Sequence, residues 1–117
     1  PHVVNFKGRY LMYHSIPPMK GEPDSGWNIG IAESKDLMNW TKVGEITPAP
    51  EADYEKKGLC APGALVKDGK VHLFYQTYGN GKKDAICHAI SDDGIHFRRN
   101  PTNPIFHRPE IGLVGVP

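Results

Sequence analysis

Two stretches of this chain align with each other without a gap, and this repeat constrains the fold more than any other feature. They are GIAESKDLMNW, which starts at Gly30, and CHAISDDGIHF, which starts at Cys87, so matched positions are 57 apart. An alanine, a serine and an aspartate recur, and Trp40 matches the aromatic Phe97. Such a period indicates that one supersecondary unit occurs twice.

The segments that precede these stretches repeat as well. VVNFKGRYLMYHS pairs with ALVKDGKVHLFYQT, and their turn glycines Gly8 and Gly69 are 61 positions apart. Short apolar runs between turn residues, with 13 glycines and 11 prolines in 117 residues, predict an all-β chain. No segment shows a long apolar stripe of helical period. The expected strands are 2–6, 9–14, 27–34 and 40–43 in the first unit, and 64–66, 71–78, 85–91 and 95–98 in the second.

Four-stranded antiparallel units that repeat at this spacing are typical of β-propeller blades. The sequence therefore predicts one blade at about 1–46, a second at about 58–106 and the start of a third at 107–117. The alternative is an ordinary meander whose Gly/Asp turns match by chance. Two blades alone leave sheet faces exposed, so we expect a piece of a larger propeller. The start at Pro1, without Met, fits a chain cut from something longer.

Composition argues against several functions. The formal net charge of +1 provides no field for nucleic acid or an anionic membrane, and no apolar run is long enough to span a bilayer. There is no phosphate-binding glycine motif and no G-x-S-x-G motif of a serine nucleophile. No cofactor is expected. Cys60 and Cys87 are predicted to be two free thiols. They fix no compartment, and a periplasmic or secreted location is the working expectation.

The blade-like segments PHVVNFKGRYLMYHS, APGALVKDGKVHLFYQTYG, HAISDDGIHF and NPTNPIF resemble the five-bladed propeller glycoside hydrolases of family 43 and the related families 32 and 117. The resemblance implies an active-site pocket on the propeller axis. It places the catalytic base immediately before Pro1 and the general acid beyond Pro117. It also places Gly63 where family 43 enzymes often carry an acid that tunes the general acid.

Strand polarity in a blade then ranks the candidate sugar-binding residues. His2 follows the expected base and His14 ends a strand, and both could bind sugar hydroxyls. Trp27 could stack on a sugar ring or pack between blades. Gln76 also ends a strand, and Asp84 could accept hydroxyl hydrogen bonds or cap its loop.

The remaining polar residues are predicted to be structural. Turn contexts make Asp36, Asp68, Asp92 and Asp93 loop-capping residues. Glu51, Asp53 and Glu55 are expected to be solvated in a polar loop. The spacing of His72, His88 and His96 fits no metal-binding motif, so no metal site is expected.

The sequence thus predicts part of a glycoside hydrolase that cleaves oligo- or polysaccharides by acid/base catalysis, with the fragment inactive on its own. Its partners would be a carbohydrate substrate and the remainder of the propeller. One alternative is a glycoside phosphorylase, with Arg98, Arg99 and Arg108 as a candidate phosphate-binding cluster. Another is a non-catalytic carbohydrate-binding propeller, which Gly63 favours.

Overall fold

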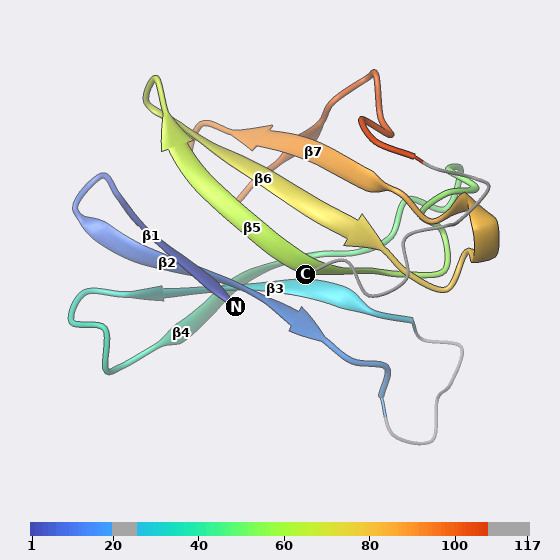
Figure 1. The fold of residues 1–117 in the computed structure, drawn as a ribbon. Coiled ribbons are helices and arrows are strands. Elements are labelled where there is room, and N and C mark those ends of the chain that lie inside the picture. Colours follow the sequence, from blue (N-terminus) through green and yellow to red (C-terminus); the bar gives the residue numbers. More distant parts are fainter. Residues whose placement is uncertain (20–25, 108–117) are drawn as a thin grey trace.

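The computed structural model describes residues 1–19 and 26–107, and these form two antiparallel sheets of four strands each (Figure 1). Arg108, the rest of 108–117 and the loop segment 20–25 lie outside the described residues. The first sheet has the order β1-β2-β3-β4 and the second β5-β6-β7-β8, so each follows the chain as a meander. The bounds are β1 His2–Phe6, β2 Arg9–Ile16, β3 Asn28–Ser34, β4 Thr41–Ile46, β5 Leu59–Lys67, β6 Lys70–Thr77, β7 Ile86–Ser91 and β8 Arg98–Arg99, with a 3-10 turn, η2, at Gly81–Lys83.

The prediction of an all-β chain with two four-stranded sheets is confirmed, although most strand boundaries shift, three strands by the most. β4 continues to Ile46, β5 begins already at Leu59, and β8 is reduced to two residues. β8 starts late because the amide groups of Ile95 and His96 donate to the carboxylate of Asp93 and so belong to the preceding turn. No helix in the described ranges is long and apolar enough to cross a membrane.

Both sheets begin with the same tight hairpin. Lys7 and Gly8 have φ angles of 52° and 80°, and Asp68 and Gly69 have 54° and 74°. Two consecutive residues with positive φ in a two-residue loop match the type I′ turn, whose twist fits the twist of the flanking strands. The sequence signal that separates β1 from β2 is therefore repeated exactly where β5 turns into β6.

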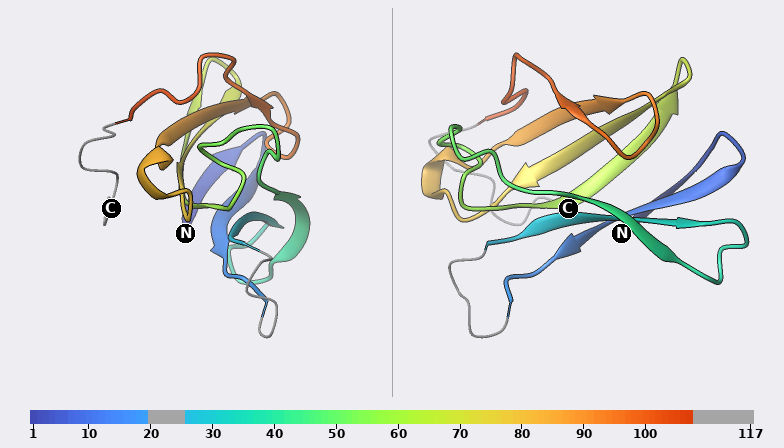
Figure 2. Two further views of the ribbon diagram at one scale, coloured as in Figure 1. Left: turned by 90° about the vertical axis from the view of Figure 1, so that its right-hand side faces the viewer. Right: turned by 180° about the vertical axis from the view of Figure 1, so that it is seen from behind.

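The two sheets pack against each other around one core, as the two further views show (Figure 2). The first sheet buries Leu11, Tyr13 and Ile31, all almost fully inaccessible to solvent. The second sheet buries a face at its own alternate positions. That face consists of Val71, Leu73, Tyr75, Cys87 and Ala89.

The buried faces of the two sheets are not the matched faces of the repeat. Leu11 is buried, whereas its match His72 is on the half-buried open face of the second sheet. Conversely, Leu73 is buried and its match Met12 is half-buried on the open face of the first sheet. The sheets are thus stacked front to back, in the same orientation, and among residues 1–19 and 26–107 each has one face without a neighbouring sheet.

The connection from the third to the fourth strand is built in the same way in both sheets. The Ser34 hydroxyl donates to Asp36 Oδ1 over 3.0 Å, and the Ser91 hydroxyl donates to Asp93 Oδ1 over 2.9 Å. Each aspartate then accepts backbone N–H groups two and three residues later at 2.8–2.9 Å. We call residues 34–40 the first turn and residues 91–97 the second turn. Their shared hydrogen bonds show that the sequence repeat is a structural repeat, and that Asp36 and Asp93 cap loops as predicted.

Candidate functional site

Four of the predicted sugar-binding residues, His14, Trp27, Gln76 and Asp84, gather at one end of the two sheets, which we call the candidate edge, whereas His2 starts β1 and contacts Ala64 further along β5. The candidate edge consists of the end of β2, the starts of β3, β5 and β7, and the end of β6, on the right of Figure 1. Phe106 returns to this edge, where it bridges Ile86 at the start of β7. The four-stranded meander causes this gathering, because alternate strand ends fall on the same side.

The start of β5 bulges at the candidate edge, and the first sheet holds it there. The β5–β6 register shifts between Cys60 and Gly63, and Ala61 has a positive φ of 51°. The amide of Ala61 donates to the Ser15 hydroxyl over 2.9 Å. The amide of Ala64 donates to His2 Nδ1 over 2.6 Å. A bulge that frees backbone amides for a neighbouring sheet is a common way to re-aim a strand.

His2 therefore has a defined structural contact, and its ring is oriented by it. Because Nδ1 accepts a backbone hydrogen bond, Nε2 must carry the proton in the neutral ring and can serve as a donor. The residue as a whole is exposed. Sequence reasoning missed Ser15 and the positive φ of Ala61. No sequence signal pointed to this angle, because a residue before proline favours extended backbone angles with negative φ.

His14 is half-buried on the open face of the first sheet, against β3. A Cβ atom at Gly30 would lie 2.4 Å from Cε1 of His14, so this ring position requires glycine in the neighbouring strand. The ring Nδ1 lies 3.4 Å from the carbonyl oxygen of Ser15. His14 is therefore packed in place by the sheet itself.

Trp27 joins the two sheets. Its carbonyl accepts from the amide of Leu59 over 3.0 Å, and its ring packs edge-to-face on Tyr78 with centroids 6.0 Å apart. A Cβ at Gly58 would lie 3.0 Å from the Tyr78 carbonyl oxygen, so glycine allows this close approach. The side chain of Tyr78 remains 51% exposed and presents an aromatic surface at the candidate edge.

Asp84 and Gln76 are adjacent to the start of β5. The Asp84 carboxylate accepts from the Asn80 amide at 3.0 Å and from the Asn80 side chain at 2.9 Å, so it caps its loop. Gln76 pairs with Cys60 across β5 and β6. Burial raises the pKa of the Cys60 thiol, and the negative charge of Asp84 raises it further. This keeps the thiol protonated and unreactive near neutral pH.

The prediction that Glu55 is solvated is wrong. Its side chain is fully buried and accepts from Arg99 Nε at 2.9 Å, from Arg99 Nη2 at 2.5 Å and from the Tyr75 hydroxyl at 3.2 Å. The backbone amide of Ala49 donates to the same carboxylate. Burial and then the Glu55 charge raise the pKa of Tyr75, and the same two causes raise that of Cys87 to about 12. Position in a polar loop gave no hint of this network, because its partners come from β6 and β8.

The arginines that could have formed a phosphate site are used elsewhere. Arg99 also donates to the carbonyl of Thr47 at 2.8 Å, and Arg98 pairs with Asp92 at 3.1 Å, on the end of the sheet opposite the candidate edge. Both arginines form β8, the outer strand of the second sheet.

Glycoside hydrolysis requires two carboxyl groups on either side of the scissile bond. The described carboxylates near the candidate edge are committed to other contacts. Asp84 caps its loop, Glu55 is buried with Arg99, and Asp53 lies 3.5 Å from Lys83. Nor do the described residues include a group of three or more His, Cys, Asp or Glu placed to hold a metal ion. The arrangement can orient a polar ligand, and it lacks an acid/base pair within the described ranges.

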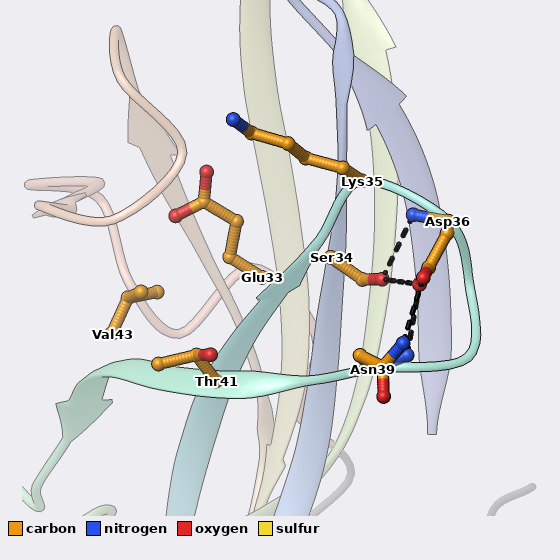
Figure 3. Close-up of a pocket in the computed structure, with 7 residues that line it drawn as sticks. All are labelled: Glu33, Ser34, Lys35, Asp36, Asn39, Thr41 and Val43. Carbon is orange, nitrogen blue, oxygen red and sulfur yellow. Dashed lines mark hydrogen bonds between the residues drawn. The ribbon is translucent and has the colours of Figure 1, made fainter.

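A hollow of about 410 Å³ lies at the opposite end of the first sheet, beside the first turn (Figure 3). Glu33, Lys35 and Val43 line it together with residues of that turn. No predicted sugar-binding residue lines this hollow.

Comparison with known proteins identifies the family. Residues 2–113 match the family model of the glycosyl hydrolases family 32 N-terminal domain. A sucrose-6-phosphate hydrolase of Escherichia coli is 31% identical over 105 residues, which cover 83% of this chain and 22% of that protein. The chain therefore spans about a fifth of the length of this relative.

Solved structures share the fold at lower identity. Zg3597, a family 117 glycoside hydrolase of the marine bacterium Zobellia galactanivorans, superimposes with a TM-score of 0.73 at 23% identity, over 89% of this chain and 32% of that one. Fructan 1-exohydrolase IIa of Cichorium intybus gives a TM-score of 0.72 at 19% identity, over 94% of this chain and 21% of that one. The expected resemblance to this group of glycoside hydrolases is confirmed, and the family model selects among the three families named from the sequence. The chain belongs to the glycosyl hydrolase family 32 N-terminal domain family.

Proposed function

We propose that this chain forms two neighbouring blades of a five-bladed propeller glycoside hydrolase that cleaves glycosidic bonds in a pocket on the propeller axis. The observation that carries the proposal is the family 32 match over residues 2–113, on a chain that folds into two sheets stacked in the same orientation. Stacked meanders of this kind close into a ring when further sheets are added. The blades would be residues 1–46 and 58–106, with 107–117 leading into a third.

In this proposal the catalytic carboxyl groups come from outside the described residues. The base would stand immediately before Pro1 and the general acid beyond Pro117. The chain's own contribution is one wall of the pocket, formed by the candidate edge. His2 Nε2 donates beside the base, and Gln76, His14 and Trp27 orient the sugar. Asp84 contributes by fixing the loop that ends at β7.

The names of the relatives suggest the first substrates to test. One is a sucrose-6-phosphate hydrolase and another a fructan exohydrolase, so we propose a glycoside containing fructose as the substrate. The reaction would be hydrolysis by a general acid and a carboxylate base or nucleophile, without an organic cofactor.

The test is a substrate panel applied to the longer protein. Sucrose, sucrose 6-phosphate, fructan and aryl glycosides would be offered with and without inorganic phosphate, and released sugar measured. The hydrolase proposal expects sugar release that does not depend on phosphate and that is lost when the residue before Pro1 is replaced. Sugar release that depends on phosphate would show a phosphorylase in place of a hydrolase. Unchanged activity after replacement of the residue before Pro1 would overturn the assignment of the base.

A non-catalytic carbohydrate-binding propeller is the second candidate. It is favoured by Gly63, which stands where family 43 enzymes often carry an acid, and by the loop-capping contacts of Asp84. Binding of a sugar in the panel without its cleavage would support this candidate.

A further inference from the structure

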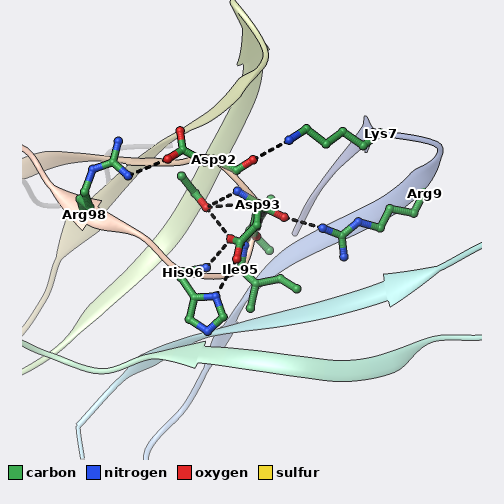
Figure 4. A network of polar contacts seen from close by, with 10 residues as sticks. Lys7, Arg9, Asp92, Asp93, Ile95, His96 and Arg98 are labelled. Carbon is green, nitrogen blue, oxygen red and sulfur yellow. Dashed lines mark hydrogen bonds and ion pairs between the residues drawn. The ribbon is translucent and has the colours of Figure 1, made fainter.

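The first and second turns share their internal hydrogen bonds and differ in their surroundings. The second turn lies against the β1–β2 hairpin of the first sheet, and this contact is a row of side-chain donors on successive carbonyl oxygens (Figure 4). The row is Lys7 Nζ to Asp92 at 2.9 Å, Arg9 Nη2 to Asp93 at 2.5 Å and the Tyr13 hydroxyl to Gly94 at 2.7 Å.

Close packing accompanies these polar contacts. A Cβ atom at Gly94 would lie 2.4 Å from Cδ1 of Leu11, so only glycine fits there. Phe97 meets the Tyr13 ring edge-to-face, with centroids 5.7 Å apart. The second turn therefore forms a packing surface for a hairpin with cationic side chains. The β1–β2 hairpin occupies this surface.

In the first turn, most residues that match those of the second turn are exposed to solvent. Leu37 and Met38 stand at the positions of Gly94 and Ile95, yet their side chains are 47% and 82% exposed. Trp40 takes the place of Phe97 and is half-buried. Within residues 1–19 and 26–107, no hydrogen bond reaches the carbonyl oxygens that match those bound by Lys7 and Arg9.

We propose that the first turn is the docking surface for the β1–β2-type hairpin of a further four-stranded sheet of the same polypeptide. That hairpin carries two cationic side chains, at the positions of Lys7 and Arg9, which donate to the carbonyls of Lys35 and Asp36. This inference rests on the proposal that the chain is part of a larger propeller. It adds which surface of the first sheet receives the blade on its other side, and what side chains that blade presents to it.

Two differences between the turns specify the partner further. The Leu37 carbonyl already accepts from Trp40 Nε1 at 3.1 Å, so the partner needs no tyrosine hydroxyl at the place of Tyr13. Leu37 also carries a side chain at the place where Gly94 leaves room for Leu11 of the packed hairpin. The partner hairpin therefore carries a small residue where the first sheet has Leu11.

A second copy of this chain does not fit the surface. Its β1–β2 hairpin is already occupied by its own second turn. Its other hairpin, between β5 and β6, keeps a cation, Lys70, at the position of Arg9, but places the acid Asp68 at the position of Lys7 and Phe74 at that of Tyr13. A carboxylate directed at a carbonyl oxygen is repelled, so this hairpin can make only one of the two cationic contacts.

The test adds a third sheet in the register of the repeat. Pro1 and Pro62 are matched positions, so a copy of residues 1–61 is placed directly before Pro1 of the complete chain. The added copy carries Leu11→Ala to make room for Leu37, and leucine at its three methionines. The readout is the rate at which peroxide oxidises Met38, resolved by peptide mass spectrometry, with Met19 as the internal reference.

We expect the added sheet to slow Met38 oxidation by about fivefold or more, because a tethered sheet has a millimolar effective concentration. Lys7→Ala with Arg9→Ala in the added copy restores the rate of the single chain, and leaving its Leu11 unchanged weakens the protection. Unchanged oxidation in every tandem form, or equal protection by the Lys7→Ala/Arg9→Ala form, overturns the proposal.

A second measurement guards against an added copy that fails to fold. Met38 oxidation is compared between the 117-residue chain and the longer natural protein, where we expect protection of the same size. Equal rates overturn the docking surface. Neither measurement involves a sugar, so this result is independent of whether the protein proves to be a hydrolase.

Discussion

At the scale of single residues, Glu55 shows how much a side chain can depend on partners far away in the sequence. Its carboxylate is fully buried, with Arg99, Tyr75 and the amide of Ala49 around it. Arg99 extends the network to the Thr47 carbonyl. The network therefore fastens the connection between the two sheets, which leads directly into the bulge at the start of β5.

Removing the Glu55 charge should destabilise the chain strongly. Glu55→Gln leaves the Arg99 guanidinium without its anion, and breaking a buried pair from one side costs about 3 kcal/mol. The matched control is Asp53→Asn in the same loop, since the Asp53–Lys83 pair is exposed and contributes less than about 1 kcal/mol. Urea unfolding at low protein concentration measures both. Equal effects of the two substitutions would show that the Glu55 network does not stabilise the fold.

Asp36 gives a pH-dependent prediction. The backbone amide of Asn39, followed by the Asn39 side chain, the Met38 amide and the Ser34 hydroxyl, holds the pKa of Asp36 well below its usual range. A carboxyl group whose pKa is lowered by folding stabilises the folded state above its unfolded pKa of about 3.9 and loses this contribution as the pH falls. Asp36→Asn should therefore lower the Tm at pH 7 and have less effect at pH 3. A Tm difference that is the same at both pH values would contradict this assignment.

At the scale of elements, the serine–aspartate turn is the clearest unit of the molecule, because the same hydrogen bonds recur in both sheets. The repeat made this turn predictable from sequence. It did not reveal that one copy of the turn packs against another sheet while the other copy faces solvent, because both copies have the same local pattern of residues.

Substitutions at matched positions of the turns should act in opposite directions. In the Gly94→Ala variant, alanine would have to adopt a positive φ of 80°, and its Cβ would lie 2.4 Å from Leu11. We therefore expect the free energy of unfolding to fall by more than about 2 kcal/mol. Leu37 is exposed and has a strained positive φ of 71°, which glycine adopts without strain. Leu37→Gly should therefore raise the free energy of unfolding by up to about 1 kcal/mol.

The control for this pair is Gly63→Ala, because a Cβ there meets no atom within 4 Å. Its effect on unfolding should stay within about 0.5 kcal/mol. Chemical denaturation of the three variants measures all effects. A Gly94→Ala variant as stable as the Gly63→Ala variant would refute the tight fit of the second turn.

At the scale of the whole molecule, the front-to-back stacking leaves each sheet with one uncovered face. Exposed apolar side chains on the two sheets and at the candidate edge include Val3, Leu65, Tyr78 and Phe106. Surfaces of this kind are usually covered in a stable protein. The arrangement is the one expected for a chain flanked by further blades.

The isolated chain should consequently self-associate. We expect its apparent mass in light scattering to rise with micromolar protein concentration, because open sheet faces and edges bind one another. Leu65→Lys should lower this association relative to Lys35→Arg, a conservative change on the exposed first turn. A monomeric chain with a single cooperative unfolding transition would contradict the view that it is part of a larger propeller.

The sequence alone predicted the eight strands, the two hairpin turns, the loop-capping roles of Asp36 and Asp93 and the group of related glycoside hydrolase families. These features follow from local rules, since strand alternation, Gly8 and Gly69, and the side chains of Asp36 and Asp93 act within a few residues of themselves. A repeat doubles the strength of each such signal.

Only the tertiary structure decided which face each sheet buries, because matched residues such as Leu11 and His72 have different neighbours in space. The same holds for the burial of Glu55, the bulge at Ala61 and the contact from His2 to Ala64, each of which depends on atoms from another sheet or a distant strand. Contacts between residues far apart in the chain produce no periodic pattern in a single sequence. They can be identified only once the packing of the two sheets is known.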